Sequence, residues 1–163
     1  MLEFEYERMG ALAYLAAWDV RQAKVFGLCK TSTGIESFRE LVDVVMCQEP
    51  YRSAQRVFWI TDNGSSHRGQ ASIDRLKSWY PNAIQVHTPI HASWLNQIEI
   101  YFSVLQRKVL TPNDFESLED LNNRILGFQE TYETIAKPFE WKFTREDLKK
   151  VLAKLDDEQK LAA

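Results

Sequence analysis

The sequence predicts an α/β domain in which helices pack on a mixed sheet, and three observations lead to this prediction. Residues 10–17 and 24–29 are apolar, strand-like runs joined by a short polar connection, which predicts an antiparallel hairpin. After the hairpin, short β-branched runs alternate with segments of helical periodicity. The 163 residues are 45% hydrophobic and 26% charged, which is typical of one soluble globular domain.

The first helix is expected to follow the hairpin and to open at Thr33 and Gly34. Glu49-Pro50 should end it, because the residue before a proline avoids the helical backbone. Residues 57–61, VFWIT, carry the strongest strand signal, and the turn sequence Asp62-Asn63-Gly64 ends that strand. The helix has apolar residues every three or four positions, which predicts one buried face: Ile35, Phe38, Leu41, Val42, Val45 and Met46.

A second helix is predicted at residues 70–79, with Ile73, Leu76 and Trp79 facing inward. Residues 84–87 then read as a strand that ends at Thr88-Pro89. From Ser93 the pattern is helical again, and its apolar stripe is formed by Trp94, Leu95, Ile98, Tyr101, Phe102 and Leu105.

Two further helices are predicted at about residues 117–135 and 144–155. We expect the tail 156–163 to fray, so that residues 1–155 form one domain.

Several classes of protein are excluded by what the sequence lacks. It has no run of about 18 apolar residues that would span a membrane. The N-terminal MLEFEYER is acidic and shows no secretory signal. Cys29 and Cys47 form no CxxC pair, which argues against a zinc ribbon or a disulfide scaffold. We therefore expect a cytoplasmic protein with two reduced thiols and no membrane partner.

Charge is distributed unevenly along the chain, whose formal net charge is -3. Residues 51–112 carry seven basic and three acidic side chains, a balance of +4, whereas the flanking segments carry -3 and -4. Such a basic centre either binds a polyanion or reflects chance patterning on a solvated surface.

Two carboxylates in this basic segment are candidates for catalytic metal ligands. Asp62 directly follows the strand at 57–61, and ligands gather at the carboxyl ends of strands in open α/β sheets. Glu99 flanks the buried stripe of the following helix; alternatively it forms a surface salt bridge. Two carboxylates about 4 Å apart repel by roughly 4 kcal/mol at an effective dielectric near 20, which a divalent cation between them would relieve. Two Mg²⁺ ions so held can promote phosphodiester displacement.

Three stretches resemble the DDE-superfamily transposases of bacterial insertion sequences, of the mariner-like group. They are ITDNGSSHRG at 60–69, HTPIHASWLNQIEIYFSVLQRKVLTPNDF at 87–115 and KPFEWKFTREDL at 137–148. The segment GALAYLAAWDVRQAKVFG at 10–27 is similar to the hairpin that follows that group's first catalytic strand. Asp62 and Glu99 are separated by 36 residues, and Glu99 lies within the string N-Q-I-E.

The resemblance implies a ribonuclease H-like fold and an Asp-Asp-Glu triad that holds two Mg²⁺ or Mn²⁺ ions, with Asp62 as the second acid and Glu99 as the third. It also implies that DNA is the partner: such enzymes cut transposon ends and use the freed 3′-hydroxyl to attack target DNA.

The first acid of the triad has no match in this sequence. The resemblance would place it on a central strand upstream of residues 10–17, and Asp19 reads better as a turn residue. We therefore expect a chain that lacks the first, central strand, truncated or frame-split, and inactive alone. A homodimer or a complementing N-terminal fragment is then a possible partner. The alternative is a catalytically dead relic that binds DNA or another protein.

Other residues have weaker claims on the site. His67 either contacts a phosphate or the metal's surroundings, or caps a helix. Asn96 and Gln97 either position Glu99 or a water molecule, or cap the next helix. Arg107 and Lys108 either touch the DNA backbone or lie on a solvated face. The possible contacts to DNA or around the metal are Asn63, His67, Arg68, Asn96, Arg107 and Lys108.

A third hypothesis is a metal-dependent hydrolase that acts on a small substrate. It would use Asp62 and a zinc site made from His67, His87 and His91.

Overall fold

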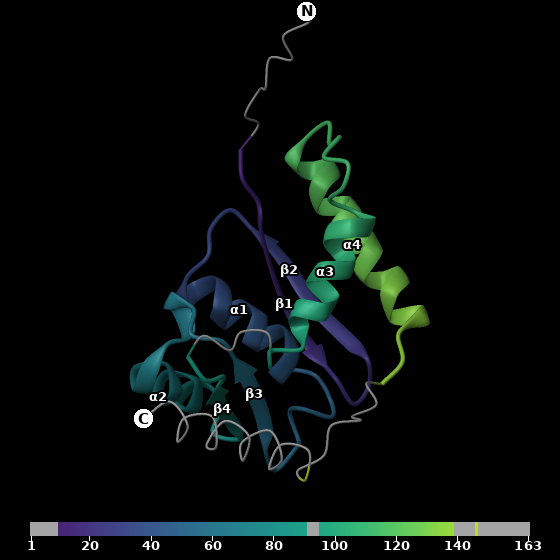
Figure 1. Cartoon of the computed structure of the whole chain (residues 1–163). Coiled ribbons are helices and arrows are strands. Elements are labelled where there is room, and N and C mark those ends of the chain that lie inside the picture. Colours follow the sequence, from purple (N-terminus) through teal and green to yellow (C-terminus); the bar gives the residue numbers. More distant parts are fainter. Residues whose placement is uncertain (1–9, 91–94, 139–145, 147–163) are drawn as a thin grey trace, which may run out of the picture.

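The computed structural model describes residues 10–90, 95–138 and 146, and it has a mixed α/β arrangement (Figure 1). The observed order confirms the predicted succession from the first hairpin to the helix expected at 117–135. The helix predicted at 144–155 lies outside the described residues except for Glu146. The elements are β1 (Ala13–Asp19), β2 (Lys24–Lys30), α1 (Ile35–Met46), β3 (Val57–Thr61), η1 (Ser65–His67), α2 (Gly69–Trp79), β4 (Ala83–His87), α3 (Ile98–Lys108) and α4 (Leu118–Ile135).

The β1–β2 hairpin is antiparallel, and Asp19 holds its turn. Oδ1 of Asp19 accepts hydrogen bonds from the backbone N–H groups of Arg21 and Gln22, at 2.8 and 3.0 Å. Its other oxygen accepts a hydrogen bond from the hydroxyl of Tyr51 at 2.6 Å. The prediction that Asp19 is a turn residue is thus confirmed.

The described strands pair as two small sheets. β1 pairs with β2, while β3 pairs with β4 in parallel from Val57↔Ala83 to Thr61↔His87. Among the described residues no ladder joins β1 to β3, so the single mixed sheet that the sequence predicts is not seen there. The apolar run at residues 10–17 predicts a strand that is buried on both faces, but every residue of β1 is only half-buried. Within the residues that the structure describes, β1 has a hydrogen-bonded neighbour on one edge only, which leaves the strand more open than a central strand.

Helix α1 joins the two sheets through one core cluster. Its buried face contacts Phe26 of β2, Trp59 of β3 and Leu76 of α2. Most of the predicted face is buried as expected, but Ile35, the first helical residue, is 42% exposed. The residues that α1 contributes to the cluster are Phe38, Leu41, Val42, Val45 and Met46.

A second cluster packs α3 and α4 against the hairpin, and Figure 1 shows these two helices side by side next to β1 and β2. At its centre, Tyr101 donates its hydroxyl proton to the Tyr14 hydroxyl, which in turn donates to Gln129 Oε1. α3 begins at Ile98, later than the predicted Ser93, and Leu95 is accordingly exposed rather than part of the buried stripe. Trp94, also expected there, lies outside the described residues.

Helix α4 begins with a side-chain cap. The Ser117 hydroxyl oxygen accepts a hydrogen bond from Asp120 N–H, which satisfies one of the free donors of the first turn. None of the helices in the described part of the chain combines the length and the apolar character that a membrane span requires.

We predict that the free energy of unfolding falls at alkaline pH, because four tyrosines of the fold are half-buried or buried. Burial is the largest cause that raises the pKa of Tyr14, Tyr51, Tyr80 and Tyr101 above the ordinary value of 10.0. Above about pH 10 the unfolded chain loses these protons while the folded chain keeps them, so the free energy of unfolding falls as pH rises. Urea denaturation between pH 9 and 11 should show this decline.

The Tyr51→Phe variant provides the test of that explanation. Tyr51 donates to Asp19, and the variant lacks the titrating hydroxyl. We expect a lower stability at pH 8 but a shallower decline above pH 10. A decline as steep as that of the unmodified chain would contradict the assignment to Tyr51.

Candidate active site

The candidate site starts from Asp62, the residue that directly follows β3. Along β3 the side chains of Trp59 and Thr61 are buried, whereas those of Phe58 and Ile60 are exposed. This alternation anchors the strand on its inner face and brings its carboxyl end to the surface. The Asp62 side chain is 37% exposed there, which leaves its carboxylate accessible to a ligand.

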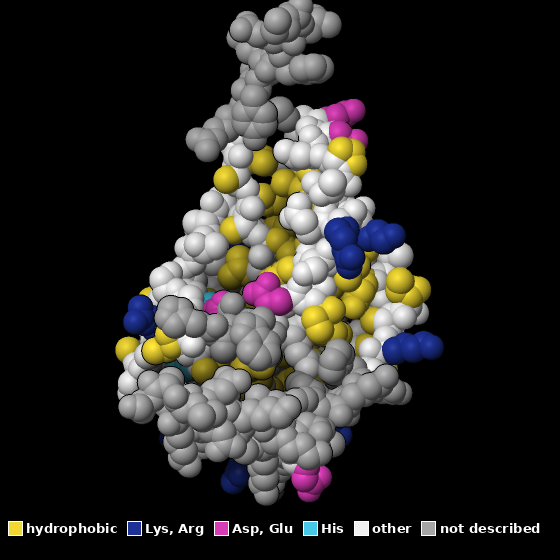
Figure 2. Space-filling model, viewed as in Figure 1, with side chains coloured by type: hydrophobic (Ala, Val, Ile, Leu, Met, Phe, Trp, Pro, Cys, Tyr) yellow, Lys and Arg dark blue, Asp and Glu magenta, His cyan; other side chains and the backbone are white. Residues whose placement is uncertain are grey.

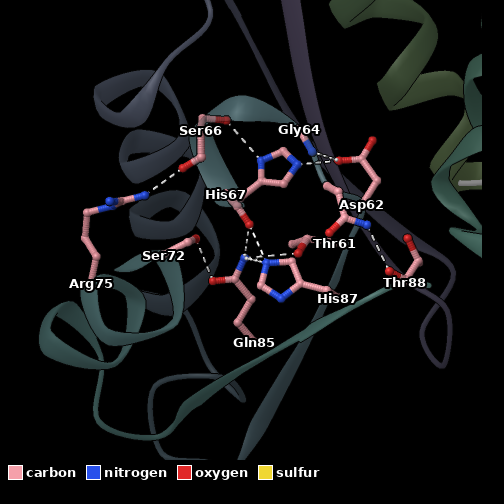
Figure 3. A network of polar contacts seen from close by, with 11 residues as sticks. Thr61, Asp62, Gly64, Ser66, His67, Ser72, Arg75, Gln85, His87 and Thr88 are labelled. Atoms are coloured by element: carbon pink, nitrogen blue, oxygen red, sulfur yellow. Dashed lines mark hydrogen bonds and ion pairs between the residues drawn. The ribbon is translucent and has the colours of Figure 1, made fainter. Parts of the chain in front are cut away.

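The two carboxylate oxygens of Asp62 have different surroundings. Oδ1 accepts hydrogen bonds from Gly64 N–H at 2.9 Å and from His67 Nε2–H at 2.5 Å. Oδ2 has no hydrogen-bond partner among the described residues and points away from the polar network (Figure 3). A fixed aspartate with one free oxygen is suited to hold a hard divalent cation, since Mg²⁺ and Mn²⁺ prefer oxygen ligands.

The turn after β3 requires a glycine at position 64. A Cβ atom there would lie 2.8 Å from His67 Nε2 and 3.1 Å from Asp62 Oδ1. A side chain at this position would therefore push the imidazole away from the carboxylate. The glycine of the string D-N-G thus permits the close approach of the two side chains.

Opposing effects set the pKa of Asp62. Partial burial raises it, because desolvation disfavours the charged carboxylate. The hydrogen bonds from His67 and Gly64 lower it and outweigh burial, so that the pKa lies below its ordinary value. Asp62 is therefore ionised at neutral pH, in the form that binds a metal ion.

His67 is held from several sides. Its Nε2–H donates to Asp62, so Nδ1 is the acceptor and receives a hydrogen bond from the Ser66 hydroxyl at 3.0 Å. Its ring also packs against that of Phe38, with centroids 5.2 Å apart. The residue at the cap of α2 is Arg68, with no side-chain cap hydrogen bond, so His67 does not act as a helix cap.

Asn63 and Arg68 differ in what they contact. The Asn63 amide donates to the backbone carbonyl of Thr88 at 3.0 Å, which ties the loop after β3 to the end of β4. Arg68 is exposed and has an extended backbone just before α2. Asn63 therefore stabilises the site loop, while Arg68 remains available to solvent or a ligand.

Glu99 is exposed in the first turn of α3. Its N–H donates to the backbone carbonyl of Asn96 at 3.1 Å, whereas Gln97, at the cap position, makes no side-chain cap hydrogen bond. The proposed capping roles of these two side chains are therefore not observed. The convergence of Glu99 and Asp62 on one ion stays a prediction.

Figure 2 shows charged side chains on one face of the molecule. Acidic side chains lie near the middle of this face and at its upper and lower ends, and basic side chains lie on its α3–α4 side and also at the opposite edge. Arg107 and Lys108 are exposed in the last turn of α3. Arg107 Nε donates to the carbonyl of Ser103, one turn earlier in the helix.

The zinc alternative finds no support in the described part of the chain. His87 Nε2–H donates to the carbonyl of His67 at 2.5 Å, so this nitrogen is already engaged. His91 lies outside the described residues. Within residues 10–90, 95–138 and 146, no three His, Cys, Asp or Glu residues are grouped so as to hold a metal ion.

Sequence reasoning missed a buried polar network behind the site. It is centred on Gln85 of β4, whose partners include Ser72 of α2 and the backbone of His67 (Figure 3). One signal was available: Gln85 is a polar residue at an inward position of an otherwise apolar strand, and buried polar side chains need hydrogen-bond partners.

Comparison with known proteins supplies the remaining evidence. A family model described as DDE superfamily endonuclease matches residues 2–122. A search of curated proteins gave no match. The matched range includes Asp62, Glu99 and every element from β1 to α3.

Proposed function

Because the chain belongs to the DDE superfamily of endonucleases, we propose that it is the catalytic domain of a transposase that cuts transposon ends and joins them to target DNA. The motifs at 60–69 and 87–115 support an origin in a bacterial insertion sequence of the mariner-like group. The observation that carries the proposal is the Asp62 carboxylate, fixed after β3 with one oxygen that has no hydrogen-bond partner among the described residues.

Asp62 and Glu99 are the residues that would hold Mg²⁺ or Mn²⁺. Both offer carboxylate oxygens: Asp62 is ionised at neutral pH, and Glu99 is exposed at the start of α3. The bound ions would activate the attacking oxygen and stabilise the leaving oxygen in phosphodiester displacement. His67 holds the other oxygen of Asp62 and so orients the carboxylate toward the ion.

DNA is the substrate that the charge distribution supports. Residues 51–112, which contain both carboxylates, carry a charge balance of +4. Arg68, Arg107 and Lys108 are exposed and available to phosphate oxygens. Contacts of this kind weaken as salt rises, so DNA binding should fall between 50 and about 200 mM salt.

The resemblance to DDE transposases implies a third carboxylate at the site. Asp19 and Asp43 are the aspartates that precede Asp62 in the sequence. Asp19 holds the hairpin turn, and Asp43 accepts a hydrogen bond from the Tyr80 hydroxyl at 2.8 Å. We propose that the missing acid lies on a strand that inserts between β1 and β3 and is supplied by a complementing N-terminal segment. A second copy of the chain is the other possible source.

Metal binding tests directly the hypothesis that Asp62 and Glu99 bind the same divalent ion. Calorimetric titration of the chain with Mn²⁺ should show that Asp62→Asn and Glu99→Gln each weaken binding at least about tenfold, because each removes a ligand of the same ion. Asp74→Asn and Glu119→Gln are matched controls, since both residues are exposed acids and Glu119, like Glu99, lies in the first turn of a helix. Unchanged binding in Glu99→Gln would contradict the hypothesis.

DNA cleavage tests the need for complementation. The chain alone should not nick supercoiled plasmid above the level of Asp62→Asn in Mn²⁺. Addition of a segment encoded upstream of the Met1 codon, with an aspartate on a strand, should restore nicking. Strong nicking by the chain alone, abolished by Asp62→Ala, would overturn the proposal that DNA cleavage depends on a complementing segment.

Asp19 and Asp43 both accept hydrogen bonds from other groups of the fold. This observation also favours a second candidate, a catalytically dead relic that binds DNA. It predicts salt-sensitive DNA binding without measurable Mn²⁺ binding, and no segment would restore nicking.

A further inference from the structure

A buried glutamine lies behind the candidate site. Gln85 is in the middle of β4 and is only 6% exposed, although its neighbours Ile84 and Val86 are apolar. Its side chain lies on the same face of the two-stranded sheet as Thr61, toward α2, as the close-up shows (Figure 3). An amide in such a position is costly to bury unless its donors and acceptor are all used.

The Gln85 amide joins three elements. Its oxygen accepts a hydrogen bond from the Ser72 hydroxyl of α2 at 2.8 Å. Its nitrogen donates to Thr61 Oγ1 of β3 at 3.0 Å and to the backbone carbonyl of His67 in η1 at 2.9 Å. One side chain therefore fixes the end of β3, the start of α2 and the turn between them.

The η1 turn is held at two neighbouring carbonyl groups. The carbonyl of His67 accepts from Gln85 and also from His87 Nε2–H. The carbonyl of Ser66 accepts from Arg75 Nη2 at 2.7 Å. Because β4 and α2 hold the backbone at residues 66 and 67, the backbone position from which the His67 side chain extends is fixed relative to β3.

The imidazole of His67 then has few orientations left. The Ser66 hydroxyl occupies Nδ1, and Phe38 packs against the ring. The remaining nitrogen, Nε2, reaches Oδ1 of Asp62. A continuous set of contacts thus runs from Gln85 through the backbone and ring of His67 to one oxygen of Asp62.

We propose that Gln85 is a positioning residue of this site: it holds the η1 turn so that His67 binds one oxygen of Asp62 and the other oxygen faces the divalent ion. The part that concerns the ion rests on the proposed function. The part that concerns His67 and Asp62 does not, and it can be tested in the metal-free chain. Gln85 makes no hydrogen bond to Asp62 itself, so it acts on that carboxylate through the residues it holds, His67 and Thr61.

The test replaces Gln85 by methionine, which has a similar length but makes none of the three hydrogen bonds. The matched control is Gln129→Met. Gln129 is also part-buried and bonded on both sides, to the Tyr14 hydroxyl and the Val25 carbonyl, but these partners belong to the other core cluster. Circular dichroism and urea denaturation of both variants report folding and the loss of stability.

The decisive readout is the side-chain NMR spectrum of His67, assigned with His67→Gln. The unmodified chain should show a proton on Nε2 that exchanges slowly with solvent and a bare Nδ1. In Gln85→Met we expect exchange of that proton to be at least about tenfold faster, whereas Gln129→Met should leave it unchanged. An unaltered His67 signal in folded Gln85→Met would overturn the proposal.

A milder variant keeps the test decisive if Gln85→Met does not fold. Ser72→Ala removes only the hydroxyl that holds the Gln85 oxygen, and it should produce a smaller shift of the same His67 signal. No change in folded Ser72→Ala, when Gln85→Met cannot be measured, counts against the proposal.

Mn²⁺ titration separates this proposal from the proposed function. If the unmodified chain binds Mn²⁺, Gln85→Met should bind about fivefold more weakly and Gln129→Met equally well. If the unmodified chain does not bind Mn²⁺, the proposed function fails, while the His67 signal still decides the role of Gln85. Equal Mn²⁺ binding and an equal His67 signal in Gln85→Met would overturn the positioning role alone.

Discussion

The Asp62→Asn substitution is expected to lower the rate of metal-dependent DNA cleavage at least about a hundredfold, because a metal ion stabilises the transition state by several kcal/mol and each 1.36 kcal/mol is a factor of about ten. The substitution should impair metal binding without disturbing the local fold. An asparagine oxygen can still accept the hydrogen bonds from Gly64 N–H and His67 Nε2–H, so the turn after β3 should persist. What is lost is the charge and the free carboxylate oxygen.

The measurement is the initial rate of plasmid nicking in Mn²⁺, in the assembly that shows cleavage: the chain with its complementing segment, or the chain alone if that proves active. Asp74→Asn is the control, because Asp74 is exposed on α2 and, within the described part of the chain, is hydrogen-bonded only to Gln70. The control should cleave at the unmodified rate. An Asp62→Asn enzyme that retains more than about a tenth of the rate would mean that Asp62 is not a metal ligand of the reaction.

The largest expected effect on stability comes from Leu76→Ala. Leu76 is fully buried in the cluster that α1, α2, β2 and β3 share. Removal of three side-chain carbons there should lower the free energy of unfolding by about 2–5 kcal/mol. Since domains are typically stable by only about 5–15 kcal/mol, this loss is a large share of the total. Helix α2 also carries Ser72 and Arg75, so its loosening should disturb the η1 turn.

Urea denaturation checks this prediction through a lower midpoint with an unchanged slope. Leu95→Ala is the matched control: Leu95 is 44% exposed, and its replacement should change the free energy of unfolding by no more than about 0.5 kcal/mol. Equal losses of unfolding free energy in the two variants would show that the stability of α2 does not depend on the cluster around Leu76.

Local patterns in the sequence determined much of this protein. The order of strands and helices follows from hydrophobic periodicity and from turn residues, which act over a few positions along the chain. The role of Asp19 in its hairpin and the location of Asp62 at the end of β3 follow in the same way. The D-N-G turn and the resemblance around residues 60–69 then identified the candidate metal ligand.

Only the tertiary structure decided which side chains meet at the site. The contact between Gln85 and the His67 carbonyl joins residues 18 positions apart, on separate elements whose packing no local pattern specifies. The half-burial of β1 likewise depends on which strands lie beside it, not on its own apolar sequence. Periodicity determines which face of an element is apolar, whereas the partner that covers this face, and the polar groups it brings, are determined only when the elements pack together.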